Sequence, residues 1–316
     1  MKRTIGVIAP SLPSEGIRRE RVERAIGYLE SLGNRVIVSP HVFEKASYKS
    51  ASASKRAAEF CALIANPEVD VVMCTTGGYN SNEMLAFLDW ELLARGRATV
   101  VGYSDVTALL LALFKRTQLP VVQGAMLVDW VQYPGAFSDL WRVLDGTPYR
   151  LGVPEALWES ADKENFTPPG IQLIPALGRG ISREKVAGQV IAANLSTLNL
   201  MLGTPYFPDL KGRVLLLEYD KEENFCLPSL ERMLWQLRLA GALEGLAALL
   251  FGVLQPAVAA EEVQQERTIQ DLLGEVAAGA SYPVFYNVPF GHMYPSWQVQ
   301  QGCWCEIDCE GLVVCG

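Results

Sequence analysis

The sequence predicts an α/β protein, in which an open, mostly parallel sheet with flanking helices is followed by a C-terminal β-rich α/β domain. Over the first 150 residues, short apolar segments rich in Val and Ile alternate with segments of helical periodicity. The apolar segments lack polar alternation, which is typical of parallel strands covered on both faces. Strands that alternate with helices imply right-handed crossovers within one sheet.

Four strands and, before the helix that follows Ser104, two helices are predicted in this first part. One helix covers 18–32, because apolar residues recur on one face and Gly33 follows the last turn. A second helix covers 53–65 and ends before Pro67. The apolar face of the first helix holds Val22, Ala25, Ile26 and Leu29, and the strands cover 4–9, 35–39, 69–75 and 98–103.

The pattern changes from about Gly152 to Arg183, where prolines, glycines and mixed charges predict an irregular connection. A connection of this length is either a domain linker or a functional loop. We therefore expect an N-terminal domain over 1–150, a connecting loop over 151–183 and a C-terminal domain over 184–316. Elements of the last domain are predicted over 186–192, 214–217, 228–240, 247–254 and 284–288.

The composition excludes several kinds of partner. A net charge of -8 and a pI near 5.0 argue against a surface that binds nucleic acid. The apolar stretch from Leu239 to Leu254 is interrupted by glycines and by Glu244, and it falls short of the roughly 20 residues that cross a bilayer. We expect a helix end, a turn and a buried strand there, and no membrane association. The N-terminal apolar stretch is too short for a secretion signal.

Seven cysteines, an odd number, are simplest to explain as free thiols in a reducing compartment, which predicts a cytoplasmic protein. Four of them crowd the C-terminus, so a zinc site is one interpretation. Zinc ligands usually come in closely spaced pairs, and only the second gap here, from Cys305 to Cys309, approaches that pattern. Cys303 and Cys305 also alternate with Trp304 and Glu306, as residues of a strand would. We favour strand thiols over zinc and predict no metal and no other cofactor.

Ser104 stands at the junction between the strand over 98–103 and a helix predicted to begin at Asp105, with Val106, Leu109, Leu110 and Phe114 inward. A serine at a sharp strand-to-helix turn projects its hydroxyl, and the next backbone N–H points where an oxyanion forms. The helix N-terminus adds partial positive charge. The alternative is that Ser104 and Asp105 simply cap the helix.

A glycine pair, Gly77 and Gly78, follows the strand over 69–75 and therefore lies at a carboxyl end of the sheet. Open α/β proteins bind ligands there, and glycines let the backbone approach closely. Neither the phosphate-loop nor the dinucleotide fingerprint is present, so nucleotide cofactors of those types are not expected. The alternative is a turn with Asn80 or Ser81 as a helix cap.

Only two histidines, His41 and His292, could activate a serine. His41 follows Pro40 just after a strand, where a surface loop is expected. His292 follows Gly291 in an irregular segment after a buried strand, the kind of place where catalytic side chains are displayed. A loop histidine without a catalytic role remains the alternative.

Glu218 ends an apolar strand and could orient an imidazole, as the third member of a catalytic triad does. The alternative is a solvated strand end. We expect that simpler environment for the acids that follow, Asp220, Glu222 and Glu223.

The segments IGVIAPS, GGYNSNEML, GYSDVTALL, NLSTLNLMLGTPYFPDLKGRVLLLE and FGH occur in this order over almost the whole chain. Together they resemble the LD-carboxypeptidase family of serine peptidases. The resemblance implies Ser104 as nucleophile, Glu218 and His292 as its partners, and the backbone amides of Gly78 and Asp105 as oxyanion donors. It also implies two domains, a homodimer and chemistry that needs no metal.

Within that family, GGYNSN looks closer to the microcin C self-immunity branch than to the murein-recycling branch. That branch implies hydrolysis of an amide in a small peptide or a peptidyl- or aminoacyl-nucleotide, with aromatic residues of a mobile loop stacked on adenine. Trp158 and Phe166 would form such a platform, or else pin the connection to the core. The implied substrate-binding residues are Gly77, Tyr79, Asn80, Trp158 and Phe166.

Two other functions stay open. One is an LD-carboxypeptidase that removes D-alanine from murein tetrapeptide. Its substrate carries a free carboxylate and needs a cationic partner, for which Lys221 and Arg183 are guesses. The other is a non-catalytic protein that binds a peptide or nucleotide, in which the triad geometry would be broken.

Overall fold

The structure is a computed structural model that describes residues 2–130, 133, 138–158, 165–174, 185–220, 226–254 and 267–315. Contacts between Cα atoms divide the chain into two units. Unit 1 comprises Met1–Leu144 and Gly203–Pro208, and unit 2 comprises Asp145–Leu202 and Asp209–Gly316. Each unit is described by itself.

Unit 1 contains a parallel sheet with the strand order β2-β1-β3-β4-β5. The apolar residues of β1, β3 and β4 are buried, in agreement with the prediction of covered parallel strands. Strand β2 differs, because it lies at the sheet edge and its end residues are exposed. The strands are β1 (Thr4–Ile8), β2 (Arg35–Val38), β3 (Val71–Cys74), β4 (Thr99–Gly102) and β5 (Val121–Gln123).

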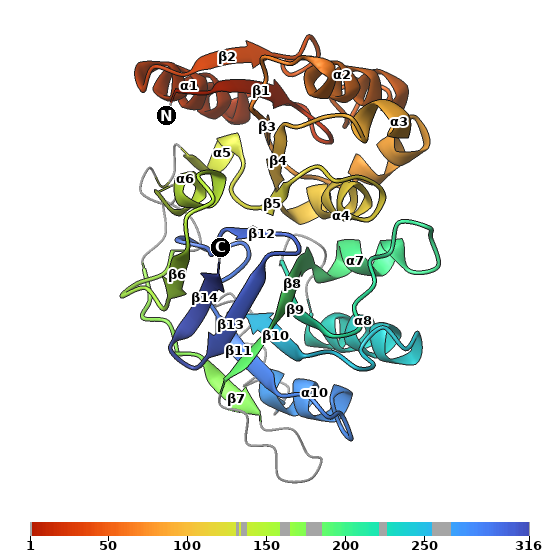
Figure 1. Ribbon diagram of the computed structural model, residues 1–316, viewed down its shortest axis with the longest axis vertical. Helices are drawn as coiled ribbons and strands as arrows, with labels where there is room; N and C mark the ends of the chain where they lie inside the picture. The colour runs from red at the N-terminus through yellow and green to blue at the C-terminus, as the bar shows by residue number, and fades with distance from the viewer. Residues whose placement is uncertain are drawn as a thin grey trace. The chain divides into compact units, whose positions relative to one another are not determined.

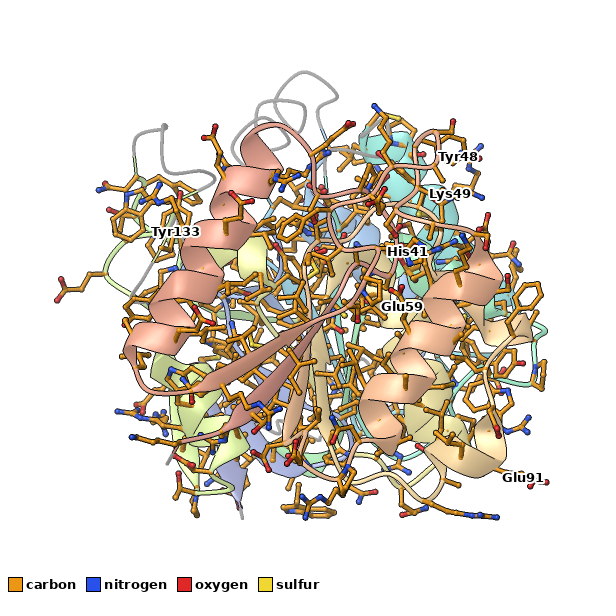
Figure 2. All side chains as sticks on the ribbon, turned by 90° about the horizontal axis from the view of Figure 1, so that it is seen from above. His41, Tyr48, Lys49, Glu59, Glu91 and Tyr133 are labelled. Atoms are coloured by element: carbon orange, nitrogen blue, oxygen red, sulfur yellow. The ribbon has the colours of Figure 1, made fainter. Side chains whose placement is uncertain are left out.

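Helices cover this sheet on both faces. Helix α1 contacts α5, whereas α2 contacts α3 and β1, and Figure 2 shows α1 and α2 on opposite sides of β1 and β2. Helix α2 has the predicted bounds. The helices are α1 (Ile17–Ser31), α2 (Ala53–Ala65), η1 (Ser81–Ala86), α3 (Trp90–Leu93), η2 (Ser104–Val106), α4 (Thr107–Arg116), α5 (Leu127–Trp130) and α6 (Ser138–Leu144).

The segment Gly203–Pro208 joins unit 1 although its neighbours in sequence belong to unit 2. The ring of Tyr206 stacks on Trp90 with centroids 5.4 Å apart, and its hydroxyl donates to the carbonyl of Leu85 at 3.4 Å. The sequence pattern did not predict this excursion, because it depends on contacts between residues more than 100 positions apart.

Unit 2 is built on a mixed sheet with the order β6-β14-β13-β8-β9-β10-β11-β7 (Figure 1). The four central strands β8 to β11 are parallel, and the outer pairs are antiparallel. The strands of this sheet are β6 (Tyr149–Gly152), β7 (Gln172–Ile174), β8 (Val186–Asn194), β9 (Arg213–Glu218), β10 (Ala248–Gly252), β11 (Val284–Val288), β13 (Trp304–Asp308) and β14 (Gly311–Cys315), and the short strand β12 (Val299–Gln300) does not belong to it. The two sheets confirm the predicted fold class.

Within the described residues, three helices flank the parallel strands of unit 2, with α8 in contact with both α7 and α10. The apolar stretch from Leu239 to Leu254 is the end of α8, a turn and buried strand β10, as predicted. No helix within the described residues is both long and apolar enough to span a bilayer. The helices are α7 (Leu195–Met201), α8 (Leu227–Leu239) and α10 (Ile269–Val276).

The C-terminal cysteines lie around β13, where Cys305 is buried, Trp304 is exposed and Glu306 is partly exposed. The thiol of Cys305 donates to the carbonyl of Gly188 on β8 at 3.4 Å. This strand alternation is the one predicted. Among the described residues, no group of three or more His, Cys, Asp or Glu side chains is arranged to hold a metal.

Candidate active site

Ser104 occupies a strained turn at the carboxyl end of β4. Its φ of 59° lies in the left-handed region, which non-glycine residues adopt rarely and often at functional sites. Gly102 lets the turn close, because a Cβ at that position would lie 2.7 Å from Cγ1 of Val106. Helix α4 therefore begins at Thr107 after the short η2 turn, two residues later than predicted.

The glycine pair lies directly against this turn. A Cβ on Gly77 would lie 3.2 Å from Oγ of Ser104, and one on Gly78, whose φ is 145°, would lie 2.5 Å from Oγ of Ser11. Gly78 cannot take a side chain, whereas a Cβ at Gly77 would require the Ser104 side chain to shift slightly. Within the described residues, the backbone N–H groups of Gly78 and Asp105 donate to no other group, so they remain available as hydrogen-bond donors beside the serine.

The Asp105 side chain has a role that the sequence pattern missed. Its buried carboxylate accepts hydrogen bonds from the backbone amides of Asn80 (3.1 Å) and Ser81 (2.9 Å), while the Ser81 hydroxyl donates to the Asp105 carbonyl at 2.6 Å. Burial raises the pKa of Asp105, and hydrogen bonds from Ser11, Ser81 and Asn80 oppose that rise. Helix α4 has no side-chain cap, so the capping interpretation of Asp105 is wrong. Its side chain instead fastens the glycine turn to the serine turn.

Asn80 occupies the N-cap position of η1, but its side chain makes no cap hydrogen bond. The Asn80 side-chain oxygen is buried and has no hydrogen-bond partner. A buried acceptor without a partner costs stability. The neighbouring Tyr79 is 54% exposed, and its amide donates to Oγ of Ser11 at 3.1 Å.

Arg56 on α2 is a second feature that sequence reasoning missed, because an arginine in a helix is normally expected to be exposed to solvent. Its guanidinium is fully buried and donates to the carbonyls of Pro10, Ala51 and Asn80 and to the carboxylate of Glu83. Burial lowers the pKa of Arg56, and the negative charge of Glu83 opposes that change. Arg56 thereby links the loops after β1 and β3.

His41 lies in the loop after β2, as predicted, and is only partly exposed. Its Nδ1 contacts the carboxylate of Glu59 on α2, and Figure 2 shows the two side chains side by side near Lys49. This pair gives His41 a structural partner within unit 1.

In unit 2, Glu218 and His292 form the interaction that the sequence predicted. Glu218 ends β9 with almost no exposure, and its Oε2 lies 2.8 Å from Nδ1 of His292. The other carboxylate oxygen accepts a hydrogen bond from Nδ2 of Asn194 at 2.8 Å. Asn194 ends β8 and also caps α7 by accepting from the amide of Thr197. The parallel ladder thus brings the two strand ends together.

Gly291 makes the approach of the histidine loop possible. Its φ is 116°, and a Cβ there would lie 2.7 Å from Cβ and 2.9 Å from Oε2 of Glu218. The Gly291 amide donates to Oγ of Ser296 at 2.9 Å, which fixes the loop from its other end.

The prediction that Asp220 is a solvated acid is wrong. Asp220 is 6% exposed, and its Oδ2 lies 3.4 Å from Nε2 of His292. It is buried because the chain turns inward after β9 toward the histidine loop, which no local pattern reveals. Glu222, Glu223 and the guessed cation Lys221 lie outside the described residues, as does Arg183.

Trp158 and Phe166 hold the connecting segment in place through backbone pairing and side-chain packing. Leu157 pairs with Phe166, and Trp158 pairs with Tyr294, two residues beyond His292. The Phe166 side chain packs on a buried cluster of Leu157, Val253 and Met293. It also lines a cavity of about 460 Å³, with other walls from Pro169, Gln172, Leu254, Tyr286 and Asn287. Packing and ligand contact are both compatible with this position of Phe166.

Apart from Trp158 and Phe166, the predicted site residues therefore fall into two groups, each placed at the carboxyl ends of parallel strands. Unit 1 gathers Ser104 and Asp105 with the Gly77–Asn80 turn, and unit 2 gathers Glu218 and His292, with Asn194 and Asp220 as partners that sequence reasoning did not propose.

Comparison with known proteins decides the family. Residues 5–124 match the sequence model of the LD-carboxypeptidase N-terminal domain, and residues 187–307 match that of the LD-carboxypeptidase C-terminal domain. The chain belongs to the LD-carboxypeptidase family. This membership confirms the resemblance inferred from the motifs and, with it, the assignment to the serine-type carboxypeptidases.

The similar proteins include a self-immunity protein and a murein tetrapeptide carboxypeptidase. The microcin C7 self-immunity protein MccF of Escherichia coli is 27% identical, over 96% of this chain and 90% of its own length. The murein tetrapeptide carboxypeptidase of Pseudomonas aeruginosa is 26% identical, over 91% and 88%. The solved structure of MccF in complex with aspartyl sulfamoyl adenosine has a TM-score of 0.86 at 24% identity and covers 100% of this chain and 96% of that one, so the fold is shared.

Proposed function

We propose that the protein is a serine hydrolase that cleaves an amide bond in a small peptide or a peptidyl- or aminoacyl-nucleotide. Ser104 is the nucleophile, His292 its general base and Glu218 the group that orients the imidazole. The observation that carries this proposal is the 2.8 Å contact between Nδ1 of His292 and the buried carboxylate of Glu218. Such a contact selects the tautomer whose Nε2 can accept a proton.

In the proposed reaction, Nε2 of His292 takes the proton of Ser104 as its oxygen attacks the substrate carbonyl. The amides of Gly78 and Asp105 receive the developing oxyanion, and each such donor contributes about 3 kcal/mol in other hydrolases. The C–N bond breaks as the imidazolium returns its proton to the leaving amine. Water then attacks the acyl-enzyme and regenerates the serine.

An aminoacyl-nucleotide amide is the substrate class that we favour. The GGYNSN segment and the likeness to the microcin C7 self-immunity protein support it. The cavity beside Phe166 offers an aromatic wall in unit 2 for a planar group. In unit 1, Asn80 remains a predicted contact, and its amide is held by the Asp105 carboxylate next to Ser104 in sequence. Trp158, Tyr79 and Gly77 remain predicted contacts.

The murein tetrapeptide is the second candidate substrate, because the carboxypeptidase of Pseudomonas aeruginosa named for it is 26% identical over most of both chains. Side-by-side assays of murein tetrapeptide and an aminoacyl sulfamoyl adenosine separate the two. We expect kcat/KM to be higher for the nucleotide substrate, and release of D-alanine as the faster reaction would overturn that preference.

A fluorophosphonate probe tests the catalytic assignment. We expect it to modify Ser104 in the wild-type protein, to fail in Ser104→Ala, and to react normally with Ser54→Ala, in which an exposed serine of α2 is removed. Turnover should be lost in Ser104→Ala while the thermal unfolding curve is retained. Full activity of that variant would falsify the assignment, and absence of labelling in the wild-type protein would favour the binding-protein alternative.

We also propose a cytoplasmic homodimer. Six cysteines of the described residues are free thiols, which supports a reducing compartment. The dimer rests on the family resemblance, and light scattering coupled to size exclusion measures it directly. A mass of 34.7 kDa in solution would contradict it.

A further inference from the structure

The imidazole of His292 faces a carboxylate at each of its two nitrogens. Nδ1 lies 2.8 Å from Oε2 of Glu218, and Nε2 lies 3.4 Å from Oδ2 of Asp220. Both acids are buried, with side-chain exposures of 2% and 7%, whereas the histidine retains 16%. Both carboxylates come from the chain at the end of β9, Glu218 as its last residue and Asp220 two residues later.

Neutral imidazole carries one N–H and can donate to only one of these carboxylates. If Nδ1 donates to Glu218, the lone pair of Nε2 faces the anionic oxygen of Asp220, which is unfavourable. Imidazolium has two N–H groups and can donate to both acids. Glu218 is also held by Asn194 at its other oxygen. The pair of acids therefore favours the protonated ring.

We propose that Asp220 is a positioning residue that acts through His292. Its carboxylate accepts a hydrogen bond from Nε2–H in the resting protein, fixes the plane of the ring and stabilises the imidazolium. Because the base must be neutral to accept the serine proton, Asp220 shifts the start of activity to higher pH. The kinetic consequence rests on the proposed function, whereas the protonation of His292 does not.

The titration of His292 tests the proposal directly, because the chain has only two histidines. Their imidazole signals are followed by NMR as a function of pH, and His41→Gln assigns them. In Asp220→Asn we expect the midpoint of His292 to fall by about one pH unit, since an opposite charge at this distance shifts a titration by about that much or more. Equal midpoints in the wild-type protein and the variant overturn the proposal.

Asp209→Asn is the matched control. It removes the same charge from an exposed aspartate just before the opposite end of β9, where the carboxylate accepts a hydrogen bond from the amide of Lys211. The His292 midpoint should stay unchanged in this variant, and a shift equal to that of Asp220→Asn would overturn a specific role for Asp220. If Asp220→Asn does not fold, as judged by circular dichroism, Asp220→Ser serves in its place.

The pH profile of kcat/KM provides the kinetic measurement. Its acidic limb should move to lower pH in Asp220→Asn by the same amount as the NMR midpoint, and it should not move in Asp209→Asn. A profile that coincides with the wild-type profile overturns the positioning role. Absence of fluorophosphonate labelling at Ser104 in the wild-type protein would instead contradict the proposed function. The NMR comparison would still show whether Asp220 stabilises the protonated form of His292.

Discussion

Replacing Gly291 by alanine should disable the proposed site while leaving the protein folded. The glycine has a φ of 116°, and an alanine Cβ would lie 2.7 Å from Cβ and 2.9 Å from Oε2 of Glu218. Carbon atoms in contact are normally about 3.5–4.0 Å apart. The histidine loop and the Glu218 side chain must therefore separate by about 1 Å, and the Glu218–His292 contact is lost or reoriented.

The size of the effect follows from that displacement. A misplacement of about 1 Å commonly lowers a rate by about 100-fold, and loss of the carboxylate that orients a catalytic histidine lowers kcat by about 10,000-fold. We expect kcat/KM of Gly291→Ala to fall between these limits. The positive φ adds a loss of about 1–2 kcal/mol in the free energy of unfolding, too little to unfold a protein of ordinary stability.

Gly279→Ala is the control, because Gly279 also has a positive φ, 80°, but nothing lies within 4 Å of the added Cβ. It should lose a similar free energy of unfolding in urea and keep its activity. Steady-state assays of both variants, together with urea unfolding, separate strain from the steric effect on Glu218. Activity of Gly291→Ala within a factor of ten of wild type would refute the reasoning.

Two further predictions concern buried groups of unit 1. Arg56→Met should lower the free energy of unfolding by about 3 kcal/mol, because the carbonyls that the guanidinium satisfies lose their donor; urea unfolding measures it, and a loss below about 1 kcal/mol would contradict this. Burial raises the pKa of the Cys74 thiol far above its ordinary value, so iodoacetamide at pH 8 should modify exposed Cys309 and leave Cys74 unreacted until the protein unfolds; peptide mass spectrometry measures both, and equal rates would be inconsistent with the buried position.

Local patterns in the sequence were sufficient to predict most helices and strands, and to predict at which strand ends the site residues lie. Helix α2 begins and ends at the predicted residues, and the strands that precede Ser104 and contain Glu218 lie where apolar runs predicted them. Apolar periodicity is a property of neighbouring residues, so it is visible without the fold. Strand β7, within the predicted connection, was not predicted, because three residues are too few to show a periodic pattern of apolar side chains.

The hydrogen-bond partners of the site residues could not be predicted from local patterns. Asn194 reaches Glu218 across 24 positions, and Arg56 joins carbonyls up to 46 positions away. An arginine in a helix and an acid after a strand look like surface residues by type, and only the tertiary fold buries them. The polar environment of a side chain depends on which strand ends become neighbours.

By itself, the sequence determined the family, the α/β class and the positions of Ser104, Glu218 and His292 at or near the ends of buried strands, because motifs and periodicity are local. Only the tertiary structure decided that Asp105 fastens one turn through its side chain and that Asp220 faces the imidazole. Those facts depend on hydrogen bonds between distant segments, and such bonds exist only after the strands have taken their order in the sheet.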